Sequence, residues 1–168
     1  ANSLLSNTTG ASNTAVGRRS LFSNTTASNN TAVGTSALLS NTTGEINTAV
    51  GSSAMYTNTT GYGNTGIGRS ALYTNNGNNN TAVGHEALEL NTSGTGLVAI
   101  GRQALESNTT GNYNVAIGYV SLDANTTGSA NIAMGLSSLG SNTTGGSNVG
   151  IGQGALSTNT TASNNTAV

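Results

Sequence analysis

The sequence predicts an all-β protein, a parallel β-solenoid of about ten coils, on three observations. A 17-residue unit recurs through all 168 residues, an unbroken glycine column marks each unit, and an aliphatic residue or Met precedes each of these glycines. A fixed repeat of this length is typical of stacked coils in which each coil contacts only its neighbours. The glycine column is Gly17, Gly34, Gly51, Gly68, Gly84, Gly101, Gly118, Gly135 and Gly152.

Asn opens every unit but one, so the units can be aligned along the chain. The opening residues are Asn13, Asn30, Asn47, Asn64, Asn80, Leu97, Asn114, Asn131, Asn148 and Asn165. Stacked identical Asn side chains can hydrogen-bond up and down such a column. The chain begins and ends inside a unit without an atypical capping unit, so we expect residues 1–168 to be a single repeat array cut from a longer fibre.

Each unit is expected to run strand, turn, strand, turn. The first strand is represented by Val115–Ile117 and ends at Gly118, and the second by Ala37-Leu38; an Asn-Thr-Thr-Gly turn follows. The unit at 64–79 is one residue short, and the loss falls within residues 74–80. A deletion inside a strand would turn every later side chain to the opposite face, so this stretch is expected to be a turn.

Side-chain alternation predicts which columns face inward. We expect the Val/Ile/Met column and the Leu column to fill the coil, and two columns of small residues to point outward. Columns limited to Gly, Ala and Ser suggest close packing against another copy of the chain, although they could also relieve crowding between stacked strands. The expected subunit-packing residues are Ala15, Ala32, Ala49, Ala82, Ala99, Ala116, Ala133, Ala37, Ala54, Ala71 and Ala104.

The composition excludes several classes of function. Charged residues make up 5% of the chain, the net charge is −1, and there is no Cys. A basic nucleic-acid-binding face and a disulfide or Cys-based metal site are therefore excluded. No apolar run reaches the length of about 18 residues that a membrane-spanning helix needs. We expect no nucleic-acid partner, no membrane insertion and no cofactor.

Two stretches, VAIGRQALES (98–107) and NVAIGYVSLDA (114–124), resemble the head repeat of YadA-type trimeric autotransporter adhesins, N-S-V-A-I-G-x-x-S-x-A-x-G. The fuller unit, N-T-A-V-G-x-x-A-L-x-x-N-T-T-G, is similar to repeats in phage tail fibres and bacterial surface proteins. The resemblance implies a homotrimer of left-handed β-rolls around a common axis. The present unit is about three residues longer and has Thr in the Val slot in half of the units.

Motifs for chemistry are weak. Residues 61–66 match G-x-G-x-x-G, but no long helix is expected to follow, so the match is attributed to the repeat glycines. His85 is the only His and suits neither a catalytic triad nor a metal cluster, so we expect no enzyme activity. Glu89, Glu106 and Asp123 share one column and could hold Ca²⁺, but a solvated edge partly neutralised by Arg102 is favoured over a metal site.

The same column carries apolar and aromatic residues in the N-terminal half. Phe22, Leu39, Tyr56 and Tyr73 could contact a host-surface molecule or glycan, or could be where subunits pack; both interpretations are kept. Asn-Thr-Thr or Asn-Thr-Ser sequons recur in the turns, where a structural need for Asn is favoured over dense N-glycosylation. The sequons begin at Asn7, Asn24, Asn41, Asn58, Asn91, Asn108, Asn125, Asn142 and Asn159.

These patterns favour a structural protein: a trimeric solenoid shaft of an extracellular or cell-surface filament, or of a virion tail fibre, able to polymerise end to end. An adhesin or receptor-binding fibre is the first alternative. An ice-binding solenoid is the second, because regular Thr columns can match an ice lattice. The Thr columns that motivate it begin Thr8/Thr25/Thr42 and Thr9/Thr26/Thr43.

Overall fold

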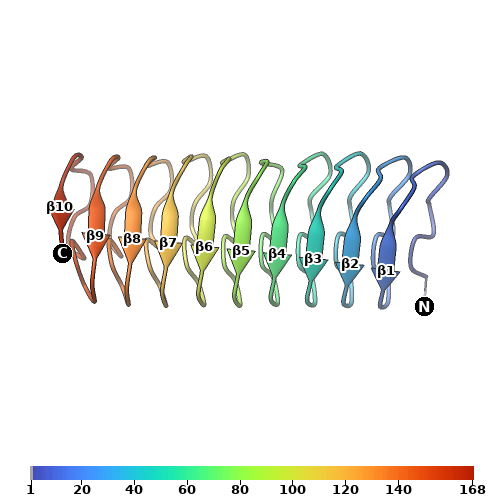
Figure 1. The fold of residues 1–168 in the computed structure, drawn as a ribbon, viewed down its shortest axis with the longest axis horizontal. Helices are drawn as coiled ribbons and strands as arrows, with labels where there is room; N and C mark the ends of the chain where they lie inside the picture. The colour runs from blue at the N-terminus through green and yellow to red at the C-terminus, as the bar shows by residue number, and fades with distance from the viewer. Residues whose placement is uncertain (1) are drawn as a thin grey trace.

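A computed structural model describes residues 2–168, which form one rod of stacked coils (Figure 1). Adjacent strands pair in parallel and in register, and the sheet order follows the chain order, so the chain makes about nine turns. No helix occurs in residues 2–168. The all-β parallel solenoid is therefore confirmed. The strands are β1 (Thr14–Val16), β2 (Thr31–Val33), β3 (Thr48–Val50), β4 (Thr65–Ile67), β5 (Thr81–Val83), β6 (Val98–Ile100), β7 (Val115–Ile117), β8 (Ile132–Met134), β9 (Val149–Ile151) and β10 (Thr166–Ala167).

The second predicted strand is wrong, because the Ala-Leu segment is a turn with left-handed residues. Ser36 has a φ of 59° and Leu38 a φ of 48°, and the corresponding positions of the other coils repeat this conformation. Positive φ is uncommon for a bulky residue. Leu38 is held there because its side chain is fully buried and its N–H donates to Ala54 O at 3.0 Å in the next coil. The segment thus stacks through hydrogen bonds without strand geometry.

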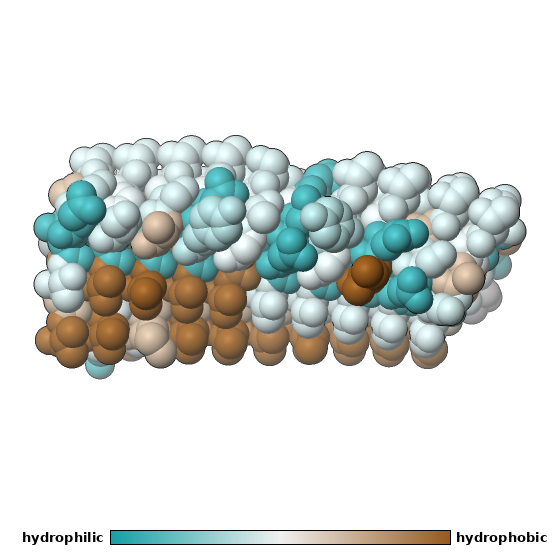
Figure 2. Space-filling view, turned by 45° about the horizontal axis from the view of Figure 1, so that its top comes forward, coloured by the Kyte–Doolittle hydropathy of each residue, from teal (hydrophilic) through white to brown (hydrophobic). Residues whose placement is uncertain are grey.

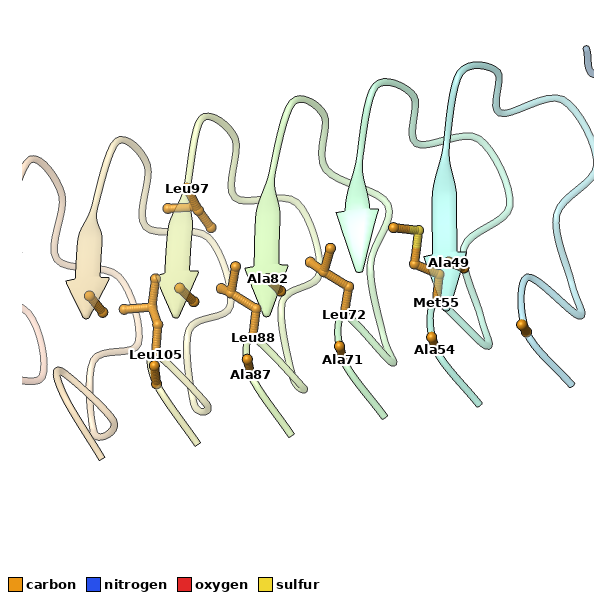
Figure 3. Packing of buried hydrophobic residues seen from close by; sticks show 14 of the residues in the cluster. Ala49, Ala54, Met55, Ala71, Leu72, Ala82, Ala87, Leu88, Leu97 and Leu105 are labelled. Atoms are coloured by element: carbon orange, nitrogen blue, oxygen red, sulfur yellow. The ribbon is translucent and has the colours of Figure 1, made fainter. Parts of the chain in front are cut away.

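The core is built from the small columns and the Leu column. Ala32 and Leu38 are 0% exposed, whereas Val16 is 57% and Ile100 is 40% exposed. The prediction that the Val/Ile/Met column points inward is therefore wrong, and the prediction for the Leu column is confirmed. Figure 3 shows Leu72, Leu88 and Leu105 reaching across the coil interior.

The alanine columns cannot be the subunit-packing surface, because they lie inside their own coil. The interior is too narrow for larger side chains. A Cβ added at Gly150, in the strand column, would lie 2.7 Å from Ser138 Oγ and 3.3 Å from Leu139 Cγ. The residues placed inside rather than between subunits are Ala32, Ala37, Ala49, Ala54, Ala71, Ala82, Ala99, Ala104, Ala116 and Ala133, with Ala15 packed against the same core.

Two buried Asn ladders hold the coils together, one in the turn that follows the Leu column and one just before the strands. In the turn ladder, Asn41 Nδ2 donates to Asn24 Oδ1 at 3.1 Å and to Gly44 O at 2.9 Å. In the ladder that precedes the strands, Asn30 Nδ2 donates to the same Gly44 O at 2.9 Å, and Asn30 Oδ1 accepts the Asn47 N–H at 2.9 Å. Among residues 2–168, every buried side-chain polar atom is satisfied, as buried polar groups must be to avoid a desolvation cost. The expected Asn stacking is confirmed.

The short unit keeps its strand in register. Thr65 of β4 pairs with Thr81 of β5, and Ile67 pairs with Val83, although only 16 residues separate the partners. The missing residue is absorbed within residues 74–80, which lie outside the strands. The prediction that this stretch is a turn is confirmed.

Candidate interaction surfaces

The outward side chains of β1–β10 form an uncharged face along the whole rod, which we call the outer face. Two of its three strand positions point outward, and charged residues occur only outside the strands. The position that precedes the glycine is aliphatic or Met in every coil. The other position is Thr from β1 to β5, Val or Ile from β6 to β9, and Thr again in β10. Figure 2 shows the resulting apolar rows, doubled toward the C-terminal part of the rod.

The exposure of the outer face distinguishes it from the core. Ile100 is 40% exposed, Ile132 and Met134 are each 38%, and Val16 reaches 57%. Large continuous apolar patches on a monomer mark interaction sites, while scattered single residues do not. From the sequence we predicted that the column preceding the glycine lies in the core. Each strand has a small residue between two larger ones, and this alternation is equally compatible with the opposite orientation.

The aromatic part of the edge column is less accessible than expected. Leu39 is buried at 7% exposure, and Phe22, Tyr56 and Tyr73 are half-buried. The rings of Tyr56 and Tyr73 stack with centroids 5.1 Å apart and planes 5° from parallel. Offset-stacked rings are favourable, so these residues stabilise the contact between neighbouring coils and offer a partner only their outer edges.

A charged cluster lies where the edge column becomes acidic. The structure brings Glu89 and Glu106 together with Glu86, so that one carboxylate oxygen of each lies within 4.8 Å of the others. Burial is the main cause that raises the pKa of Glu89 and of Glu106, and the charge of Glu86 is the next. Burial likewise raises the pKa of Asp123, which was expected to join this group but is not part of it.

Two basic side chains lie beside this cluster, Arg69 from the coil before it and His85 from the same coil as Glu86. Arg69 lies 3.9 Å from Glu86, and His85 Nδ1 lies 3.3 Å from the other carboxylate oxygen of Glu86. Arg102, the expected neutralising residue, acts on Glu106, since its charge lowers the pKa of that carboxyl and opposes the effect of burial. Its guanidinium also lies 5.4 Å from the centre of the Tyr119 ring. Partly exposed ion pairs of this kind contribute little to stability.

A shallow hollow of about 410 Å³ lies beside the first complete coil and is lined by Asn2, Arg18, Arg19 and Phe22. The Arg19 guanidinium lies 5.0 Å from the centre of the Phe22 ring, a cation–π contact. Neither arginine has a carboxylate within 4.0 Å among the described residues.

The sequon turns are structural. The side chains of Asn24, Asn41 and Asn58 are 0% exposed, and so are those of Asn91, Asn108, Asn125 and Asn142. Their amides are used in the turn ladder, so a glycosylating enzyme would have to open the coil to reach them. The first Thr of the turn is also engaged, since Thr42 Oγ1 donates to Thr59 O at 3.1 Å. The second Thr column, which includes Thr9, Thr26 and Thr43, is exposed.

No family model, curated protein or solved structure matches the chain. The part of the chain that the structure describes holds no helix long and apolar enough to cross a membrane. The fold and its surfaces are therefore the basis for a functional assignment.

Proposed function

We propose that this chain is a structural protein, the shaft of an extracellular or surface-exposed filament, in which three left-handed coiled rods associate around a common axis. The outer face is the observation that carries the proposal. It is continuous and uncharged along the rod, with one aliphatic row throughout and a second aliphatic row from β6 to β9, and it is solvent-accessible in the isolated chain. The number of subunits and the handedness come from the resemblance to adhesin head repeats.

The size of the outer face fits a contact between rods. At about 4.8 Å per strand and about 3.3 Å per residue, nine strands of three residues and one of two cover roughly 45 Å by 10 Å. Each further coil in a longer array would add about 50 Å² of the same surface on this spacing. Rods that meet along this face bury Val and Ile side chains without desolvating any charge, and this burial is the favourable term for association.

Sedimentation velocity of the purified chain tests the proposal. We expect the wild type to be a trimer at micromolar concentration. The double variant I100D/I132D should be monomeric, because its two carboxylates per chain would be buried facing those of the other chains across the axis. Ile46→Asp is the matched control, since Ile46 is 62% exposed but lies in a turn away from the strands. A wild-type chain that stays monomeric overturns the proposal. Electron microscopy of the wild type would show rods or filaments.

The adhesin alternative places recognition on the side of the same rod. The outer edges of Tyr56 and Tyr73 are the surface that favours it, because exposed aromatic edges suit contact with sugars or protein side chains. The test is binding of the wild type to host cells or to a glycan array. The alternative is supported if this binding is lost in the double variant Y56A/Y73A while the fold is retained.

The ice-binding alternative has a further candidate column on the strands, besides the exposed second Thr of the turns that the sequence suggested. The outward Thr31, Thr48 and Thr65 lie beside the aliphatic column on regularly spaced strands. Thermal hysteresis that disappears in Thr48→Lys would support it, and its absence in the wild type would exclude it.

A further inference from the structure

The Asn76 side chain supplies the hydrogen-bond acceptor that the main chain provides in the regular turns. In the regular coils, a turn carbonyl accepts two consecutive N–H groups of the coil before it, as Thr59 O does for Thr42 and Thr43, both at 3.1 Å. In the next coil this carbonyl is replaced by a side chain. Asn76 Oδ1 accepts the Thr59 N–H at 2.9 Å, the Thr60 N–H at 3.3 Å and the Thr59 hydroxyl at 2.8 Å.

Asn76 is also followed by glycine, and it is the only Asn-Gly pair in the sequence. We propose that Asn76 is a site of spontaneous chemical modification. The Gly77 main-chain nitrogen loses its proton and attacks Asn76 Cγ, and the side-chain nitrogen leaves as ammonia, which gives a five-membered succinimide. Water then opens either carbonyl of the ring, so that residue 76 becomes aspartate or isoaspartate. The net change is one water consumed and one ammonia released.

The three donors to Asn76 Oδ1 favour the first step. Attack on Cγ places negative charge on Oδ1, and donors aimed at a developing oxyanion lower the barrier, as in an enzyme's oxyanion hole. Two main-chain N–H groups and one hydroxyl already occupy these positions at 2.8 to 3.3 Å. The donors to Oδ1 are therefore already in place before the attack.

Among the described residues, the nucleophilic nitrogen and the leaving nitrogen donate no hydrogen bond, while the Gly77 carbonyl is held by Asn64 Nδ2 at 2.9 Å and by Asn75 Nδ2 at 3.0 Å. Within residues 2–168, neither the Gly77 N–H nor Asn76 Nδ2 has a hydrogen-bond acceptor, and Asn76 is exposed to the water that completes the reaction. Asn75 is the opposite case in the same turn. It is fully buried, and its Nδ2 donates to Asn58 Oδ1 at 3.2 Å and to Gly77 O at 3.0 Å, so its amide nitrogen is held.

The product is accommodated by the same turn. An aspartate at position 76 would keep the three donors and bind them more strongly, because hydrogen bonds to a carboxylate are charge-assisted. The isoaspartate product would add one carbon to the main chain of the turn that is one residue short. Modification is thus directed to the single irregular coil and adds a negative charge there.

Peptide mapping by mass spectrometry tests the proposal. The folded chain and the chain unfolded in urea are incubated in mildly alkaline buffer, and conversion at Asn76 and Asn75 is followed. We expect Asn76 to convert in the folded chain at least as fast as in the unfolded chain, while Asn75 converts only when unfolded. The proposal is overturned if Asn76 stays intact in the folded chain but converts in the unfolded chain, because the fold would then protect the site.

A variant pair tests the role of the donors. Thr59→Val removes the hydroxyl that donates to Asn76 Oδ1, and should slow conversion in the folded chain by about tenfold, less than the ~10²–10³ that one donor contributes in an enzyme's oxyanion hole. Thr126→Val is the matched control, since Thr126 Oγ1 donates to Thr143 O in a regular turn. Equal conversion rates in the wild type and Thr59→Val would contradict the assignment of an oxyanion hole.

Discussion

Met55 and Gly66 face each other across the coil interior. A Cβ added at Gly66 would lie 3.1 Å from Met55 Cε and 3.4 Å from Met55 Cγ. Met55 replaces the Leu of its column, and Gly66 replaces the Ala of its column. The longer side chain is thus compensated by the smaller residue opposite it, which shows how closely the interior is filled.

This pair predicts a coupling between two substitutions. Gly66→Ala alone should destabilise the chain by about 1 kcal/mol through overpacking. The double variant M55L/G66A restores the Leu–Ala pair of the other coils and should be more stable than the sum of the single effects by about 0.5 to 1 kcal/mol. Urea denaturation of the four proteins measures this coupling. Strictly additive effects would show that the two side chains do not compete for space.

The Asn ladder predicts a loss of stability when one member is replaced by an apolar residue of similar size. Asn47→Leu removes the acceptor of the Asn64 N–H, 3.0 Å away, and the donor to Gly61 O, 2.8 Å away. A buried N–H left without an acceptor costs about 1–3 kcal/mol, and burial of the Leu side chain offsets part of this.

The control for the ladder is already present in the chain, because Leu97 occupies the same column and is fully buried. Leucine therefore fits the space, and a loss of stability in Asn47→Leu reports hydrogen bonds rather than a clash. Thermal unfolding, with hydrogen exchange at Asn64, measures both effects. An unchanged exchange rate at Asn64 would contradict the proposed role of the ladder.

The glycine column predicts a large effect of adding a single methyl group. Gly101 has a φ of 132°, and a Cβ at this position would lie 2.5 Å from Gly118 O in the next coil. Gly101→Ala should therefore destabilise by more than the 1–3 kcal/mol typical of backbone strain at one residue. Gly140→Ala is the comparison, since its nearest contact would be 3.2 Å and its φ is ordinary. Equal unfolding midpoints for the two variants would rule out this explanation of the column.

The carboxyl groups of Glu89, Glu106 and Asp123 predict that stability falls as the pH rises above the ordinary carboxylate range. The pKa values of Glu89, Glu106 and Asp123 are raised in the folded chain, so the folded state binds more protons than the unfolded state between the ordinary and the raised values. The contribution of these groups is thus most favourable below pH ~4.5 and is lost as pH rises through their folded pKa values.

Thermal unfolding as a function of pH measures this effect. Glu89→Gln should flatten the dependence, because it removes the cost of burying one carboxylate and the repulsion of that carboxylate with Glu86 and Glu106. Glu45→Gln, at an exposed position outside the cluster, should leave it unchanged. A wild-type midpoint that rises with pH through the acidic range would contradict the prediction.

The sequence by itself determined the repeat, the all-β solenoid, the parallel register, the position of the short turn and the stacking of the Asn columns. Each of these follows from the period and from residue types that recur at one position, since identical residues one coil apart must lie over one another. The Leu column was also predicted correctly as core, because Leu recurs there as Leu21, Leu38 and Leu72 with one Met.

Only the tertiary structure decided which face of the strand lies inside. A period of two separates Ala32 from Thr31 and Val33 but does not say which set is buried. That choice depends on the width of the coil, which is set by turns whose Leu residues adopt positive φ and reach across to the strand. With Leu and the Asn amides already inside, only Ala or Gly fits opposite them, and the larger Val and Ile side chains are left on the outer face.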